Sequence, residues 1–227
     1  LSEKEVPVTL DTKSEIEWLS YNRCLTLETC KKLKLDTRII CRRIYEKSTQ
    51  AFMSQVDPQL RFLRNYQEIR PYSPHCREMI IRLDFEQMME LAIEEAKKSK
   101  KSGNKGYGAV VVMGKEILGI AHDTAITRKD PSQHAEFNAI RQAVAKFGDA
   151  NLCGGVLFST CEPCPMCSSL AIWANLTTIV YGASIEETAK YGRSRIRISA
   201  NEIVAKSPVM IEVIGNVRKK ECEALYV

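Results

Sequence analysis

The sequence predicts an α/β fold, in which a mixed sheet of about five strands lies between two helical layers and follows a helical extension. Two observations support this prediction. After residue 80, segments with the apolar period of helices alternate with short apolar runs that are typical of strands. Before residue 80, glycine is absent and the composition favours helices. We therefore expect a helical N-terminal extension over residues 1–79 and an α/β domain over residues 80–227.

Length and composition limit the possible classes of protein. The 227 residues allow one large domain, or one domain with an appendage. The net charge of +5 is modest and does not demand a nucleic-acid partner. Nine cysteines at irregular spacings do not resemble a secreted disulfide framework. No apolar run approaches the roughly 18 residues of a membrane span, and the N-terminus lacks a signal-peptide pattern. We expect a cytoplasmic protein without a membrane partner.

The N-terminal extension shows several helical signals. Residues 14–17 match a capping box, which predicts a helix that begins at Ser14. Residues 27–40 have the pattern of two short helices around a tight connection. Together with the arginines that follow, they could form a helix-turn-helix that faces phosphates. An ordinary helical hairpin with a solvated basic face is the favoured interpretation. Two prolines at positions 71 and 74 mark a break before the second domain.

Each expected element of the second domain follows from a local pattern. Residues 84–101 share one apolar helical face and end in a lysine run. Gly114 and Lys115 separate two apolar runs, which predicts a hairpin. Asp130 and Pro131 begin the next helix. The other expected elements are strands at 156–159, 177–182 and 209–214, and helices at 164–173, 185–191 and 217–225.

Two short motifs provide side chains that suit a catalytic metal site. His134 lies two residues before Glu136, and Cys164 and Cys167 have C-x-x-C spacing. One histidine and two cysteines supply three ligands to a tetrahedral zinc ion and leave the fourth position to water, which is typical of catalytic sites. Glu136 would carry protons instead of binding the metal. A redox pair would leave His134 and Glu136 unexplained. An iron–sulfur site that includes Cys161 would lack an evident fourth thiolate.

From roughly Asp84 to Val227 the chain resembles the cytidine/deoxycytidylate deaminase superfamily. Within it, the chain looks closest to guanine deaminases, yeast-type cytosine deaminases and tRNA adenosine deaminases. The resemblance rests on residues 130–136, residues 161–167 and the strand at 178–182. It implies the cytidine deaminase-like fold, bound Zn²⁺ and a homodimer. It also implies the residue roles that the motifs suggest, with His134, Cys164 and Cys167 as ligands and Glu136 as the catalytic proton carrier.

Four residues are candidates for contact with the substrate, and the resemblance bears on two of them, Asp123 and Trp173. Asp123 stands eleven residues before the histidine motif, where the family usually has a substrate-contacting Asn; the alternative is that Asp123 caps a turn. Trp173 falls where guanine deaminases carry an aromatic residue near the purine, and a core tryptophan is an equally good interpretation. Arg193 could hold a phosphate or carboxylate, although a solvated edge is favoured. Ala135 offers a backbone N–H at the start of a helix.

We therefore expect a zinc-dependent hydrolase that acts on the C–N bond of a cyclic amidine. The expected substrate is a free nucleobase or nucleoside, with guanine-like purines slightly favoured over cytosine. The alternative is a tRNA-specific adenosine deaminase. The non-enzyme alternative is a catalytically silent binding subunit that kept the fold, but such a subunit would be expected to have lost Glu136, which is present.

Overall fold

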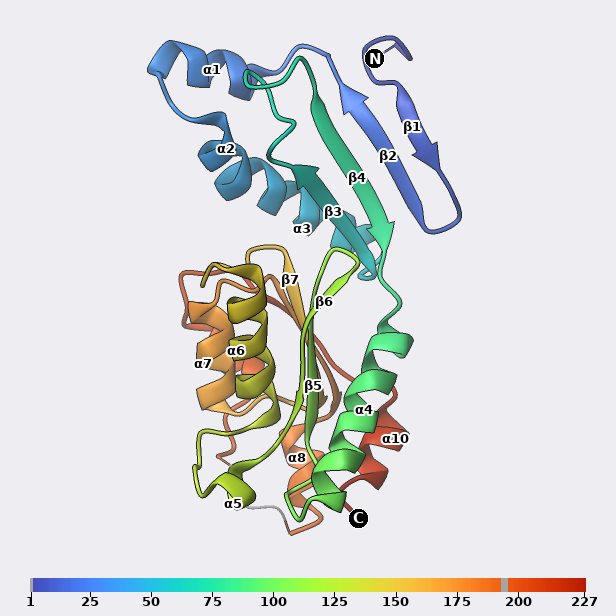
Figure 1. The fold of residues 1–227 in the computed structure, drawn as a ribbon, viewed down its shortest axis with the longest axis vertical. Coiled ribbons are helices and arrows are strands. Elements are labelled where there is room, and N and C mark those ends of the chain that lie inside the picture. The colour runs from blue at the N-terminus through green and yellow to red at the C-terminus, as the bar shows by residue number, and fades with distance from the viewer. Residues whose placement is uncertain (1, 193–195) are drawn as a thin grey trace. The chain divides into compact units, whose positions relative to one another are not determined.

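The computed structural model describes residues 2–192 and 196–227, and the chain divides into two compact units, Leu1–Leu83 and Asp84–Val227 (Figure 1). Strand β4 (Cys76–Arg82) runs through the boundary that the sequence predicts between residues 79 and 80, so the division falls a few residues later. In the described part of the chain, no helix is long and apolar enough to cross a membrane.

The second unit is built on a five-stranded mixed sheet, as the sequence predicts (Figure 1). The strand order is β6-β5-β7-β8-β9. Strand β5 is antiparallel to both β6 and β7, whereas β8 is parallel to both β7 and β9. The predicted hairpin is confirmed as the β5–β6 pair. The strands are β5 (Gly108–Met113), β6 (Glu116–His122), β7 (Gly155–Cys161), β8 (Thr178–Ala183) and β9 (Glu212–Ile214).

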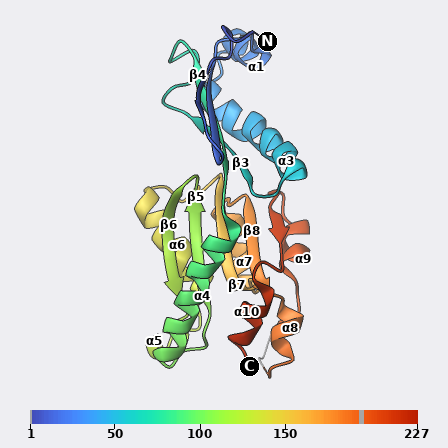
Figure 2. The ribbon, with the colours of Figure 1, turned by 90° about the vertical axis from the view of Figure 1, so that its right-hand side faces the viewer.

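Helices cover both faces of this sheet, which confirms the expected three layers. Helices α4 and α10 lie on one face, and α6 and α7 lie on the other (Figures 1 and 2). Two short helices, α5 and α9, are absent from the sequence prediction. The helices of this unit are α4 (Phe85–Lys101), α5 (Ala125–Arg128), α6 (Ala135–Phe147), α7 (Pro165–Trp173), α8 (Ile185–Ala189), α9 (Ala200–Ala205) and α10 (Lys219–Ala224).

The core of this unit explains how α6 is positioned. Every residue of β7 is buried, because this inner strand has helices on both faces. Helix α6 packs against β6 at Gly119, where an added Cβ would lie 2.1 Å from the carbonyl oxygen of Ala139. Only glycine permits this approach of a strand backbone to a helix backbone. The close packing holds α6 and therefore the histidine motif at its N-terminus.

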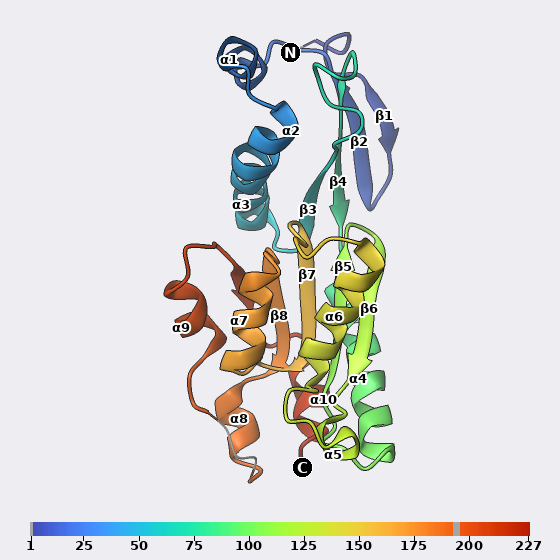
Figure 3. The ribbon, with the colours of Figure 1, turned by 60° about the vertical axis from the view of Figure 1, so that its left-hand side comes forward.

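The N-terminal unit corrects the prediction of a wholly helical extension. It contains a four-stranded antiparallel sheet in the order β1-β2-β4-β3 (Figure 3). No helix begins at Ser14, because the next residue starts strand β2, which pairs with the distant β4. Pairing between segments so far apart in sequence leaves little local signal. The strands are β1 (Val8–Asp11), β2 (Glu15–Ser20) and β3 (Leu60–Asn65), together with β4.

Helices of the N-terminal unit match the sequence prediction better than its strands do. The two short helices expected over residues 27–40 are present as α1 and α2. Lys34 ends α1 in the left-handed conformation, with φ of 53°. The helical elements are α1 (Leu25–Leu33), α2 (Thr37–Ile40), the π-helical turn η1 (Cys41–Tyr45) and α3 (Glu46–Val56). They lie to one side of the four-stranded sheet (Figures 1 and 3).

Candidate active site

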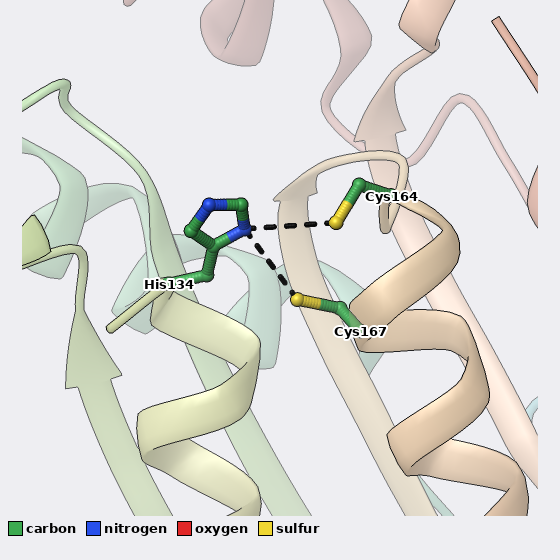
Figure 4. Close-up of side chains that lie close together, drawn as sticks. All are labelled: His134, Cys164 and Cys167. Atoms are coloured by element: carbon green, nitrogen blue, oxygen red, sulfur yellow. Dashed lines mark hydrogen bonds between the residues drawn. The ribbon is translucent and has the colours of Figure 1, made fainter. Parts of the chain in front are cut away.

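The two sequence motifs lie at the N-termini of the neighbouring helices α6 and α7 (Figure 4). His134 is the N-cap of α6 and Cys164 is the N-cap of α7, and both have an extended backbone. Pro165 is the first residue of α7. Backbone N–H groups in the first turn of a helix have no intrahelical acceptor, so proline, which lacks this N–H, is tolerated there. The local signals that begin each helix therefore also bring these side chains to adjacent helix ends.

The imidazole of His134 points toward both thiols (Figure 4). Its Nδ1 lies 3.6 Å from Sγ of Cys164 and 3.6 Å from Sγ of Cys167. Tetrahedral zinc with Zn–N of about 2.0–2.1 Å and Zn–S of about 2.3 Å separates nitrogen from sulfur by about 3.6 Å. The donor set and its spacing therefore both fit zinc. Within the residues that the structure describes, this is the one group of His, Cys, Asp or Glu arranged to hold a metal ion.

The charge states of the two thiols also suit a cation. A hydrogen bond from Cys167, helped by His134, lowers the pKa of the Cys164 thiol to about 4 despite its burial. Its neighbour has the opposite shift, because the hydrogen bond with Cys164, then burial and the Glu136 carboxylate, raise the pKa of Cys167. Two adjacent thiolates repel each other, whereas a coordinated metal ion deprotonates both.

Glu136 lies beside the thiols. It follows His134 by two residues in the first turn of α6, and its side chain is buried, with 6% of the residue exposed. Its hydrogen bond and charge contribute to the raised pKa of Cys167, which places the carboxylate against that thiol. The expected proton carrier is therefore adjacent to the candidate ligands and shielded from bulk water.

Comparison with known proteins agrees with this geometry. The family model described as "Cytidine and deoxycytidylate deaminase zinc-binding region" matches residues 82–183. The guanine deaminase of Bacillus subtilis (strain 168) is 32% identical over 111 residues, which cover 48% of this chain and 71% of that protein. The chain belongs to the cytidine and deoxycytidylate deaminase family.

Further relatives in the family are tRNA deaminases. The tRNA-specific adenosine deaminase of Bacillus subtilis (strain 168) is 38% identical over 95 residues, which span 42% of this chain and 59% of that relative. A solved tRNA deaminase, from a study of A-to-I editing at the wobble position, is similar in fold with a TM-score of 0.54. It is 24% identical, and the match covers 61% of this chain and 98% of that structure.

Asp130 and Asn138 hold the loops of the family motif, and sequence reasoning missed both roles. The carboxylate of Asp130 accepts hydrogen bonds from the backbone and hydroxyl of Ser132 at 2.9 and 2.7 Å and from Gln133 Nε2 at 2.9 Å. Asn138 Nδ2 donates to the carbonyl of His122 at 3.1 Å and to that of Gln133 at 3.3 Å. Polar residues that flank a catalytic motif by a few positions are the signal that could have indicated this.

Glu162 is a second residue whose role the sequence did not show. Its buried carboxylate accepts the backbone N–H of Ile185 at 3.0 Å and that of Ala200 at 2.9 Å. Both are the first residues of their helices, α8 and α9, so one carboxylate satisfies two helix N-termini. It thereby ties both helices to the strand end that precedes Cys164.

Cys161 does not join the metal-site cluster. Its Sγ lies 3.6 Å from the hydroxyl of Thr188 instead, and the cysteine is buried. Among the described residues, no fourth cysteine joins the group formed by His134, Cys164 and Cys167. The iron–sulfur alternative is therefore wrong for this arrangement.

Asp123 combines the two interpretations that the sequence offers. Its Oδ1 accepts the backbone N–H of Ala125 at 3.3 Å, which is a turn cap. Its Oδ2 is buried and has no hydrogen-bond partner in the described chain, and the residue is 0% exposed. The pKa of His134 is raised mainly by its hydrogen bond with Cys164, and the charge of Asp123 contributes to the same shift. The carboxylate of Asp123 therefore lies near the metal-site cluster. A buried acceptor with no partner among the described residues thus lies near the site.

The remaining predicted contacts have different outcomes. Trp173 is 82% exposed, so the core interpretation is wrong. It is the last residue of α7, a helical rise of about 13 Å from Cys164, and its contact with a base stays a prediction. Ala135 is buried at the first position of α6, as expected. Arg193 lies outside the described residues.

Proposed function

We propose that this chain is a zinc-dependent hydrolase that deaminates a nucleobase or nucleoside, replacing a ring amino group with oxygen and releasing ammonia. One observation supports this proposal most directly: His134 Nδ1 lies 3.6 Å from both thiols, with Glu136 buried beside them. Membership in the deaminase family supports the same reaction type. The family match also gives a reason to choose zinc among the metals that this donor set could hold.

Each residue of the site has a chemical role that its position supports. His134, Cys164 and Cys167 would hold the ion. When bound, zinc lowers the pKa of water to about 7 and makes hydroxide available at neutral pH. Glu136 would accept one proton of the attacking water and deliver it to a ring nitrogen, and would then take the remaining proton from the attacking oxygen and pass it to the departing amine. The backbone N–H of Ala135, at the N-terminus of α6, would donate to the developing oxygen anion.

The preferred substrate is a free base or nucleoside, with guanine-like purines ahead of cytosine. Oδ2 of Asp123, which has no partner among the described residues, favours guanine over adenosine, because an ionised carboxylate accepts only from donors. Guanine keeps ring N–H donors besides the amine that leaves, whereas the base of adenosine offers N–H donors only in its leaving amine. The guanine deaminase relative, of which the match covers 71%, supports the same preference.

A tRNA substrate is the second candidate. The relative from Bacillus subtilis at 38% identity is a tRNA-specific adenosine deaminase, and this similarity supports adenosine in tRNA as directly as the other relative supports guanine. In that case, basic residues of the chain, whose net charge is +5, would contact phosphates. We also propose a homodimer on the family resemblance, which light scattering of the purified chain would test.

Ammonia release across a panel of substrates tests the proposal. The panel contains guanine, cytosine and adenine, their nucleosides and nucleotides, and unmodified tRNA. We expect release from a base or nucleoside, with Glu136→Gln as the matched control that keeps the zinc site. Release from tRNA alone would select the second candidate. No release from any member by the zinc-loaded chain would contradict both and favour a silent binding subunit.

A further inference from the structure

The N-terminal unit contains a cavity of about 440 Å³ between its sheet and its helical elements. Residues of β2, β3 and β4 line one side, and residues of α1, α2 and η1 line the other. This volume lies within the range of small-molecule sites, about 300–1,000 Å³. The deaminase reaction makes no use of this cavity, so it requires a separate explanation.

A polar row crosses the sheet side of this cavity. Glu78 of β4 stands opposite Trp18 of β2 and opposite Arg64 of β3, so the three side chains share one face. The indole Nε1 of Trp18 donates to Glu78 Oε2 at 2.8 Å, and the hydroxyl of Ser20 donates to the same oxygen. Arg64 forms an ion pair with the other carboxylate oxygen. Both oxygens of Glu78 are therefore engaged.

Arg64 is fixed in place yet keeps a buried donor without a partner. Its side chain is 5% exposed, and its guanidinium lies over the ring of Tyr45 at 4.2 Å from the centroid. The ion pair with Glu78 and this stacking together set the plane of the guanidinium. Its Nε–H is buried and has no acceptor among the residues that the structure describes. A buried, charged donor in this condition is costly, and the atom is covered by the protein itself.

Arg70 repeats this feature from the loop after β3. Its Nη1 donates to the carbonyls of Tyr21 and Asn22 at 3.1 and 2.7 Å. Its Nε is buried and has no acceptor in the described chain, and no described carboxylate pairs with it. Because Glu78 neutralises Arg64, the guanidinium of Arg70 leaves the cavity with one uncompensated positive charge.

The rest of the wall is mixed: it contains polar residues such as Thr37, the arginine Arg23, whose charge pairs with Glu28, and an apolar cluster. Cys41, Ile69 and Cys76 form a buried cluster that lines the cavity. Burial raises the pKa of Cys41 to about 11, so its thiol stays neutral and does not compensate the arginine charge. The cavity therefore combines a buried apolar cluster with the guanidinium of Arg70, whose charge no described carboxylate pairs with.

We propose that this cavity binds a small molecule that carries one carboxylate on an apolar body. The carboxylate would accept from the guanidinium of Arg70, which lines the cavity, and the apolar body would pack on Trp18 and the Cys41–Ile69–Cys76 cluster. One negative charge matches the single uncompensated positive charge, which favours a carboxylate over a doubly charged phosphate.

Tryptophan fluorescence of the full-length chain provides the test. The chain has two tryptophans, so a Trp173→Phe background leaves Trp18, which lines the cavity, as the reporter. Phenylacetate is the probe, phenylacetamide is its neutral isostere, and phenyl phosphate is the doubly charged competitor. We expect saturable binding of phenylacetate and at least about tenfold weaker binding of the other two.

Two variants separate the proposed site from a general charge effect. Arg70→Lys keeps the charge but removes the planar guanidinium, and we expect it to weaken phenylacetate binding at least about tenfold. Arg77→Lys is the matched control, because Arg77 lies on the opposite face of β4 and pairs with Glu17 and Glu68. It should bind phenylacetate as the parent does.

Cys76→Leu narrows the cavity and leaves both arginines in the sequence. It is the test variant if thermal unfolding shows that Arg70→Lys does not fold. Weaker binding by Cys76→Leu would support the site. No saturable signal with phenylacetate up to about 10 mM would overturn the proposal. Equal binding by Arg70→Lys and the parent, or tighter binding of phenyl phosphate than of phenylacetate, would also overturn it.

Discussion

Replacement of Asp123 tests how the site selects its substrate. The two carboxylate oxygens have different environments, because Oδ1 accepts the N–H of Ala125 at 3.3 Å whereas Oδ2 is buried without a partner in the described residues. Asp123→Asn keeps an acceptor for the turn and replaces the charged oxygen with an N–H donor. Asp123→Ala removes both. The two variants therefore separate the turn cap from the substrate contact.

The expected magnitudes follow from these contacts. A substrate donor that loses a buried, charged acceptor loses about 1–3 kcal/mol or more, so kcat/KM for the natural substrate should fall about ten- to hundredfold or more in Asp123→Ala. In Asp123→Asn we expect a broadened or shifted substrate range. The free energy of unfolding should change little in Asp123→Asn, since the turn cap remains. It should fall by about 1 kcal/mol in Asp123→Ala.

The assay measures kcat/KM of the wild type and both variants over one panel of bases and nucleosides, with zinc content and chemical unfolding in parallel. Asp149→Asn is the matched control, because the exposed Asp149 caps a turn through Asn151 N–H at 2.9 Å in the same way. It should leave the activity profile unchanged. Superimposable profiles of wild type, Asp123→Asn and Asp123→Ala would refute the substrate contact and leave only the turn cap.

Three further predictions concern the metal, the proton carrier and RNA. The purified chain should contain about one zinc ion per molecule. Cys164→Ser should lose this zinc, whereas Cys161→Ser should keep it, because Cys161 contacts Thr188 instead. Metal analysis that found the reverse would contradict the ligand set. Glu136→Gln should keep the zinc and lose at least about 10²-fold in kcat, and a loss of only a few-fold would exclude this residue as the proton carrier. Filter binding of the full chain should show no sub-micromolar affinity for tRNA and no steep dependence on salt between 50 and 200 mM, whereas a steep fall would favour the tRNA candidate.

The sequence by itself determined the α/β unit and indicated the residues of its candidate metal site. Residues 84–101 repeat one apolar face over several turns, and such a long periodic segment predicts its helix well. Local sequence signals mark the starts of the two helices that carry His134 and Cys164. Helices of one layer of an α/β fold lie side by side, so the sequence could predict that the two motifs lie close together. The short helix α9 had no such repeat and was missed.

Only the tertiary structure decided the remaining features, because they depend on partners far apart in sequence. Strand β2 exists through its pairing with β4, so the local capping-box pattern at Ser14 was overridden. Trp173 is exposed because of its place at the end of α7, which composition could not show. Likewise, only folding brings Arg64 and Arg70 to one cavity and leaves on each a buried donor that has no acceptor among the described residues. A local sequence pattern predicts the backbone conformation of a residue, whereas its burial and its unsatisfied hydrogen bonds depend on the packing of the whole unit.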